Sequence, residues 1–208
     1  RANPTAGFSI ATYSGSGTSG DTLGHGLNAE PEFVIIKSRT KVDDWRVYHK
    51  GAGTGHYLRL NSNHGKTTTN NWQTVSSTTL AIDNDTAINS SSHTYVAYFF
   101  APVAGYSAFG SYTGNGSADG PFALTSFAVR WLLVKRIDAD GNSWSILDTA
   151  RNPSNVADER LRPDLSEVTI TADSADLLSN GFKIRTTAGL YNASGGEYIY
   201  WAMAENPF

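Results

Sequence analysis

The sequence predicts an all-β protein, an antiparallel, jelly-roll-like β-sandwich built from two tandem homologous repeats with pseudo-twofold symmetry. Three observations lead to this prediction. Short aromatic and β-branched runs alternate with stretches rich in Gly, Ser, Thr and Asn, as in proteins made of strands and tight turns. Helical signals are weak, and charged residues are only 17% of the chain. The third observation is that the chain repeats itself in order.

The repeat is visible as collinear matches between the two halves of the chain. "GFSIATYSGSGTSGD" at residues 7–21 matches "GYSAFGSYTGNGSADG" at 105–120, and "INSSSHTYVAYFFA" at 88–101 matches "YNASGGEYIYWAMA" at 191–204. We therefore assign residues 7–104 to repeat 1 and 105–208 to repeat 2, with 1–6 ending an upstream segment. Because only "PVA" at 102–104 separates the repeats, we expect them to pack closely, as one sandwich or as two fused sandwiches.

Strand candidates occur in the same order in both repeats. In the last candidate of each repeat, apolar residues occupy both the odd and the even positions. We therefore expect this strand at the centre of a sheet, covered on both faces. Residues 138–142, "DADGN", predict a hairpin turn. A weak helical signal at 156–167 is interrupted by Pro163. The candidates are residues 7–13, 33–38, 45–50, 56–61, 79–83 and 94–101, followed by 105–112, 131–136, 144–149, 167–171, 181–186 and 197–204.

Charge and hydropathy argue against several classes of partner. The formal net charge is -3 and no basic stripe occurs, which argues against nucleic-acid binding. No segment reaches the roughly 18 apolar residues of a membrane span, so no membrane insertion is expected. The chain has no Cys, which excludes disulfides and thiolate metal sites.

Sequence motifs give no catalytic or metal signature. The runs "YSGSG" at 13–17 and "YTGNG" at 112–116 lack the helix that a phosphate-binding loop opens, so they predict turns with left-handed backbone at two positions. "DADGN" lacks the spacing of a calcium loop. The histidines show no zinc-binding spacing, and no G-x-S-x-G elbow or paired-carboxylate array occurs. We therefore predict no enzyme activity, no metal and no cofactor.

One aromatic stands apart from the repeat. Trp72 lies in the polar stretch "TTTNNWQTVSS" at residues 67–77 and has no clear counterpart in repeat 2. Such a Trp could stack on a sugar ring or a partner surface, or it could close the edge of the sandwich. The candidate ligand-binding residues are Asn70, Asn71, Trp72 and Gln73, with Tyr191 as a weaker candidate of the same sort.

Three segments resemble a known group of proteins. "DWRVYHKGAGTGHYLRLN" at 44–61, "GYSAFGSYTGNGSADGPF" at 105–122 and "GEYIYWAMAENPF" at 196–208 resemble a repeat module of tail-fibre-like, virion-surface proteins of tailed phages, especially marine and cyanobacterial ones. The resemblance covers residues 7–208. It implies a bacteriophage surface location, other virion proteins as partners and a homo-oligomer in the intact particle. It carries over no catalytic residue.

These observations together lead to one expected function and two alternatives. We expect a non-enzymatic domain of a phage appendage that serves host attachment by binding a host-cell receptor, with a surface glycan as the expected ligand. The first alternative is a structural head-fibre, decoration or assembly module that contacts other virion proteins. The less favoured alternative is a glycan depolymerase, which needs two carboxylates facing each other across a groove.

Overall fold

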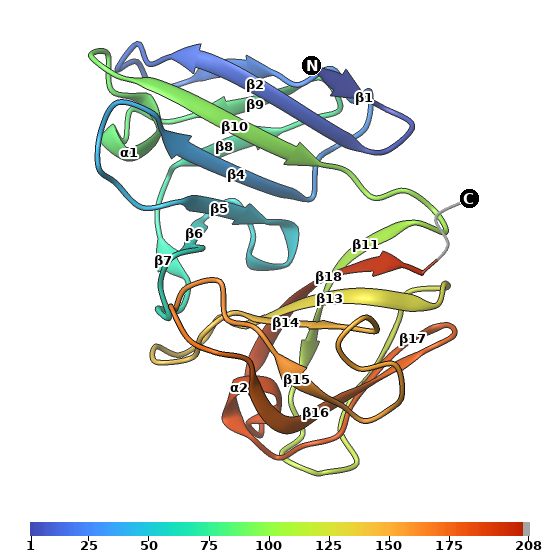
Figure 1. Ribbon diagram of the computed structural model, residues 1–208. Coiled ribbons are helices and arrows are strands. Elements are labelled where there is room, and N and C mark those ends of the chain that lie inside the picture. Colours follow the sequence, from blue (N-terminus) through green and yellow to red (C-terminus); the bar gives the residue numbers. More distant parts are fainter. Residues whose placement is uncertain (206–208) are drawn as a thin grey trace. The chain divides into compact units, whose positions relative to one another are not determined.

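The computed structural model describes residues 1–205, and nearly all of its regular secondary structure is antiparallel β-strand (Figure 1). The predicted all-β sandwich class is therefore confirmed. Repeat 2 was predicted to end at residue 208, and residues 206–208 lie outside the described part. The chain divides into two compact units: unit 1 comprises Arg1–Leu60 and Lys66–Val103, and unit 2 comprises Asn61–Gly65 and the chain from Ala104 onward. No helix within residues 1–205 is long and apolar enough to cross a membrane.

Unit 1 contains two sheets. The larger has the strand order β1-β2-β10-β4-β5-β6-β7, and the smaller has the order β3-β9-β8 (Figure 1). A 3-10 turn, η1 (Lys50–Ala52), and a one-turn helix, α1 (Thr86–Asn89), connect strands. The strands are β1 (Ala2–Asn3), β2 (Phe8–Ser14), β3 (Asp21–Gly24), β4 (Phe33–Ser38), β5 (Arg46–His49), β6 (His56–Arg59), β7 (Thr67–Thr68), β8 (Trp72–Val75), β9 (Thr79–Ile82) and β10 (Thr94–Phe100).

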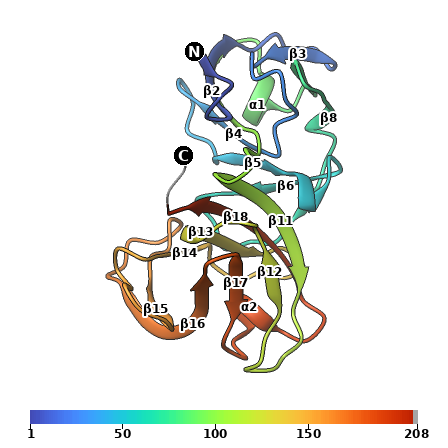
Figure 2. The same cartoon turned by 90° about the vertical axis from the view of Figure 1, so that its right-hand side faces the viewer.

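Unit 2 shares part of this strand order. Its sheets run β11-β18-β13-β14 and β12-β17-β16-β15, which match β2-β10-β4-β5 and β3-β9-β8 of unit 1 (Figure 2). The pseudo-twofold relation between the repeats stays a prediction. The strands are β11 (Ser107–Thr113), β12 (Phe122–Leu124), β13 (Val129–Arg136), β14 (Ser145–Asp148), β15 (Ala157–Arg160), β16 (Ile170–Leu178), β17 (Gly181–Ile184) and β18 (Glu197–Ala204), with α2 (Gly189–Asn192) before β18.

Each unit has its own hydrophobic core. In unit 1 the buried cluster includes Val34, Leu80 and Phe99, and all of its members lie between residues 27 and 101. In unit 2 the cluster includes Leu132 and Phe182, and all of its members lie between residues 123 and 204. Each buried cluster thus lies within its own unit, and the predicted close packing of the repeats, as one sandwich or as two fused sandwiches, stays a prediction.

The last strand of each repeat is central, as predicted. β10 pairs with β2 and β4, and β18 pairs with β11 and β13. Coverage on both faces is only partial for β10, because fully buried and half-buried residues alternate along it. The turn at residues 138–142 joins β13 to β14 as predicted, with Gly141 at φ 79. The weak helical signal instead covers β15, and neither one-turn helix was predicted.

A pair of stacked tyrosines ties the central strand to the short helix in each unit. The rings of Tyr13 and Tyr95 lie 5.1 Å apart, and those of Tyr112 and Tyr198 lie 4.9 Å apart. All four hydroxyls donate to backbone oxygens of the short helix, α1 in unit 1 and α2 in unit 2. Burial raises the pKa of each of these tyrosines. The tie therefore satisfies helix carbonyls that a one-turn helix cannot satisfy by itself.

A buried asparagine at the end of each short helix holds the glycine-rich loop. Asn89 Oδ1 accepts from the Ser16 amide at 2.9 Å, and Asn192 Oδ1 accepts from the Asn115 amide at 2.7 Å. Each amide nitrogen donates back to a carbonyl of the same loop, at 2.9 Å in unit 1 and 2.6 Å in unit 2. The predicted turn reading of "YSGSG" and "YTGNG" is thus confirmed by matching contacts in both units.

The two glycines of each run serve different purposes. Gly17 and Gly116 have φ 75 and φ 71, the left-handed backbone that was predicted. Gly15 and Gly114 lack a positive φ, but a Cβ there would lie 2.2 Å from a backbone oxygen just after the short helix. The prediction of left-handed backbone at both positions was therefore wrong for the first glycine, which is needed for close approach.

A buried lysine fastens the segment Asn61–Gly65 within unit 2. Lys135 is fully buried, and its Nζ donates to the backbone oxygens of Asn142 and, at 3.4 Å, Asn63. The Gly65 amide donates to Asp140 Oδ1 at 2.8 Å. Burial lowers the pKa of Lys135 to about 8, although Asp164 and Asp140 act in the opposite direction.

We predict that Asn192→Ala destabilises unit 2 by about 3 kcal/mol, because buried loop groups lose their hydrogen-bond partners. The free energy of unfolding in urea measures this change. Asn84→Ala is the control: Asn84 is exposed, so its effect should stay within about 0.5 kcal/mol. Equal losses in the two variants would contradict the role given to Asn192.

We predict that wild type gains stability over Lys135→Met as the pH rises from 7 to 10. The folded pKa of Lys135 is about 8, below the ordinary value near 10.5. Between these values the unfolded chain still binds a proton that the folded chain has released, so stability rises with pH. Urea unfolding at several pH values should show a relative gain of up to about 3 kcal/mol; a difference independent of pH would contradict the prediction.

Candidate functional site

Three of the predicted residues, Asn70, Trp72 and Gln73, line one pocket of unit 1. Its volume is about 370 Å³, and both Asn70 and Gln73 are exposed. The rest of the polar lining comes from Thr69, which precedes Asn70, and from Ser19, Thr54 and Asp83, which lie further away in the chain. The pocket therefore presents hydroxyl, amide and carboxylate groups together.

A β-bulge positions Gln73. Along β8 and β9, Trp72 pairs with Ile82 and Thr74 pairs with Ala81, so Gln73 is an extra residue without a partner in the ladder. A bulge bends its strand and changes the direction of the inserted side chain. The Gln73 Nε2 donates to Ser19 Oγ at 2.7 Å and lies 3.5 Å from Asp83 Oδ1.

The Trp72 ring is part of the core. Only 2% of its surface is exposed, and it makes an edge contact with Tyr48 at 6.0 Å. The predicted stacking of a sugar on its face does not fit this burial, and the alternative, a Trp that closes the sandwich, does. Its Nε1 is buried and has no hydrogen-bond partner among residues 1–205.

Asn71 lies next to the pocket in sequence but points away from solvent. It is 1% exposed, and neither its Oδ1 nor its Nδ2 has a hydrogen-bond partner in the described part of the chain. Its backbone is well held, because its carbonyl accepts from the Asp83 amide at 3.1 Å. Two consecutive residues, Asn71 and Trp72, thus carry unsatisfied polar atoms, which native structures rarely contain.

Tyr191 is not part of this group. It lies in α2 of unit 2 and is fully buried in the core there, with the Arg160 guanidinium 5.8 Å from its ring. Its ring is inaccessible, so the predicted set of five residues is not a single site.

Asp83 supplies the only charged side chain of the pocket lining. Hydrogen bonds from the Ser19 side chain and the Asn84 backbone hold the pKa of its carboxyl below the ordinary value. The carboxylate is therefore ionised near neutral pH and serves as a hydrogen-bond acceptor. Local sequence patterns did not indicate Ser19 and Asp83, because Ser19 stands in a glycine-rich turn and Asp83 begins the polar turn "DND" at residues 83–85. Only the strand register of the folded chain brings both residues close to Gln73.

Unit 2 provides an internal comparison for the pocket. The Gly20 amide donates to the Ile82 carbonyl, and the Gly120 amide donates to the Ile184 carbonyl, which fixes the alignment of the two regions. β16 and β17 then pair from residue 175 to residue 178 without a bulge. The counterpart of Gln73 is therefore absent from unit 2.

Ion pairs occupy the matching positions of unit 2. Lys183 Nζ lies 2.8 Å from Asp119 Oδ1, and Arg185 Nε lies 3.5 Å from Asp176 Oδ2. By strand register, the corresponding residues of unit 1 are Ala81, Ser19, Asp83 and Thr74. At these matched strand positions, unit 2 thus has ion-paired side chains, whereas unit 1 has an open and largely uncharged polar pocket.

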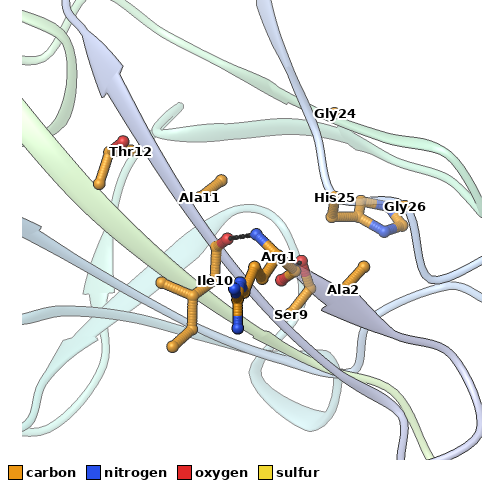
Figure 3. Close-up of a pocket in the computed structure, with 9 residues that line it drawn as sticks. All are labelled: Arg1, Ala2, Ser9, Ile10, Ala11, Thr12, Gly24, His25 and Gly26. Carbon is orange, nitrogen blue, oxygen red and sulfur yellow. Dashed lines mark hydrogen bonds between the residues drawn. The ribbon is translucent and has the colours of Figure 1, made fainter.

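A second cavity of unit 1 lies beside β1 and β2 and has a volume of about 580 Å³ (Figure 3). Its walls are mostly small and apolar, and the Arg1 amino group donates to the Ile10 carbonyl there at 2.7 Å. His25 lines it, but one ring nitrogen faces the Ser76 carbonyl and the other accepts from the Leu27 amide. Burial lowers the pKa of His25, so neutral His25 has no free nitrogen for catalysis.

A groove in unit 2, about 410 Å³ in volume, is held by internal bonds. Arg130 pairs with Glu205 at 3.1 Å and also donates to Thr149. Asn152 and Asn155 bond to neighbouring segments of the groove. Its polar side chains are therefore already used by the fold.

The carboxylates of Asp148 and Glu167, which a glycoside hydrolase could use, form ion pairs within the fold. Asp148 forms an ion pair with Arg151 and accepts from the backbone of the following turn. Glu167 pairs with Arg162 at 3.4 Å. Within residues 1–205, no three His, Asp or Glu side chains come together as metal ligands would.

Comparison with known proteins gives one match. A family model described as a domain of unknown function (DUF7483) covers residues 1–207. The curated proteins and the solved structures give no match. The chain therefore belongs to the DUF7483 family of domains of unknown function.

Proposed function

We propose that this protein is a non-enzymatic, glycan-binding domain on the virion surface of a tailed phage, where it serves host attachment. The observation that carries the proposal is the open polar pocket at Asn70, Gln73 and Asp83, whereas ion pairs occupy the matching strand positions of unit 2. The virion setting, the tail-fibre-like appendage and the homo-oligomer rest on the resemblance of the three segments described above.

The chemistry of the pocket suits a sugar. Each sugar hydroxyl both donates and accepts, and the lining offers amide donors, hydroxyls and one carboxylate acceptor. A volume of about 370 Å³ lies within the usual range for small-ligand pockets, about 300–1,000 Å³. A single carboxylate supports binding without hydrolysis, since glycosidases need two.

Binding should depend on the exposed polar residues. We predict that Asn70→Ala combined with Gln73→Ala weakens glycan binding about tenfold or more, because each lost hydrogen bond contributes about 1 kcal/mol. A panel of bacterial surface oligosaccharides, followed by calorimetry and host-cell adsorption, measures the effect. Both side chains are exposed, so folding should be unaffected, whereas truncating buried Trp72 would leave a cavity.

Asp119→Ala, on unit 2, is the matched control and should bind as wild type does. Wild-type protein that binds neither the panel nor host cells would refute the proposed function.

One surface favours the alternative, a module that assembles with other virion proteins. Phe122 and Leu124 of β12 are 46% and 59% exposed, on the edge strand of a sheet. Thr22 and Gly24 occupy the matching positions of β3, so the fold itself does not require apolar residues there. Antiparallel pairing of β12 with a second copy, centred on Ala123, would satisfy the free edge and cover both side chains.

We predict that Phe122→Thr with Leu124→Thr, which imitates the polar edge of unit 1, abolishes self-association of the domain. Light scattering over a range of concentrations measures this. Wild-type protein that stays monomeric at all concentrations, or a variant that associates equally well, would contradict the role of β12.

A further inference from the structure

We infer that the pocket of unit 1 selects an uncharged sugar, grips two neighbouring hydroxyls through Asp83, and is the single such site in each chain. The inference rests on the proposed glycan-binding function and adds the class of sugar, the residue that sets specificity and the stoichiometry.

The charge of the pocket discriminates against acidic sugars. Asp83 forms no ion pair with a Lys, Arg or His among residues 1–205, and the rest of the lining is uncharged. A uronic acid or sialic acid would bring a second negative charge to a site without a cation. Like charges brought together repel each other, so anionic sugars are disfavoured.

The carboxylate is arranged to accept from a diol. Its two oxygens offer several lone pairs, which allows one oxygen to be used by each of two adjacent hydroxyls. The Ser19 hydroxyl and the Asn84 backbone already orient Asp83, and the Gln73 amide in turn holds Ser19 at 2.7 Å. The acceptor is therefore set in place before a ligand arrives, which lowers the entropy lost on binding.

Gln73 has capacity left over for the ligand. Its Nε2 donates to Ser19, whereas no hydrogen bond to its Oε1 occurs among the described residues. The side chain is exposed, so Oε1 can accept from a third hydroxyl. The pocket therefore offers acceptors for hydroxyl donors, and its lining contains no cationic side chain to pair with a carboxylate or sulfate ester.

The described residues of unit 2 differ at the positions that form the pocket of unit 1. Where unit 1 has the small Ala81, unit 2 has Lys183, which bonds to Asp119 and to the Gly120 carbonyl at 3.0 Å. Arg185 stands in place of Asp83, and no bulge supplies a glutamine. Two repeats therefore yield one binding site.

The test compares three proteins by calorimetry and on an oligosaccharide panel: wild type, Asp83→Asn and Asp119→Asn. The panel contains neutral sugars and their uronic-acid counterparts. We expect wild type to prefer neutral sugars with one site per chain, and to lose binding when periodate cleaves the vicinal diol. We expect Asp83→Asn to weaken binding at least about 20-fold, since charge-assisted bonds exceed neutral ones, and Asp119→Asn to leave it unchanged.

The outcomes separate this inference from the proposed function. Glycan binding that favours acidic sugars, that survives periodate or Asp83→Asn, or that has two sites per chain would overturn the inference and leave the proposed function standing. No binding of any sugar or host cell by wild type would overturn both. Thermal unfolding of each variant checks that a loss of binding is not a loss of fold.

Discussion

The structure of each unit depends on the hydrogen bonds between a tyrosine near the start of its central strand and the short helix that precedes this strand. Tyr95 and Tyr198 donate to helix carbonyls and accept from the backbone amide that follows the helix. Buried polar groups need such partners, and a four-residue helix leaves most of its own unsatisfied. Asn89 extends the tie to the glycine-rich loop by donating to the Thr18 carbonyl, next to Ser19 of the pocket. The pocket thus adjoins the end of the sandwich that these hydrogen bonds hold together.

The two units show which features the frame requires and which it does not. The stacked tyrosine pair, the buried asparagine and the glycine that packs against the backbone after the short helix occur in both units. These features therefore belong to the folding of the repeat. The bulge at Gln73, the carboxylate of Asp83 and the apolar edge of β12 each occur in one unit only. Because the matched strands have the same order in both units, their order does not explain these differences. The proposed function therefore rests on these differences.

Much of the fold was predictable from the sequence, whereas the site was predictable only in part. β4 and β18 follow from apolar runs with the predicted bounds, since a buried strand needs such a run. α1 is too short for a helical period, and it is made by tertiary bonds and by the Asp85 cap on the Ala87 amide at 2.7 Å. The polar setting of Trp72 led to the residues of a pocket, but the structure differs from the expectation of an accessible ring: Asn70 and Gln73 are exposed, whereas the indole is buried. Asp83 needed the register of β9, which no local pattern gives.

The pocket of unit 1 lies beside a β-bulge and beside buried polar atoms that have no hydrogen-bond partner among the described residues. In unit 2 the ladder of β16 and β17 continues through the matching residues, and Ser174, the counterpart of Asn71, bonds to the Ala172 carbonyl. In unit 1, Gln73 has no partner in the strand ladder. The buried polar side-chain atoms of Asn71 and Trp72 have no hydrogen-bond partner among the described residues. Both features lower stability. Because unit 2 also contains buried polar atoms of this kind, it is the bulge, absent from the ladder of β16 and β17, that distinguishes the matching region of unit 1.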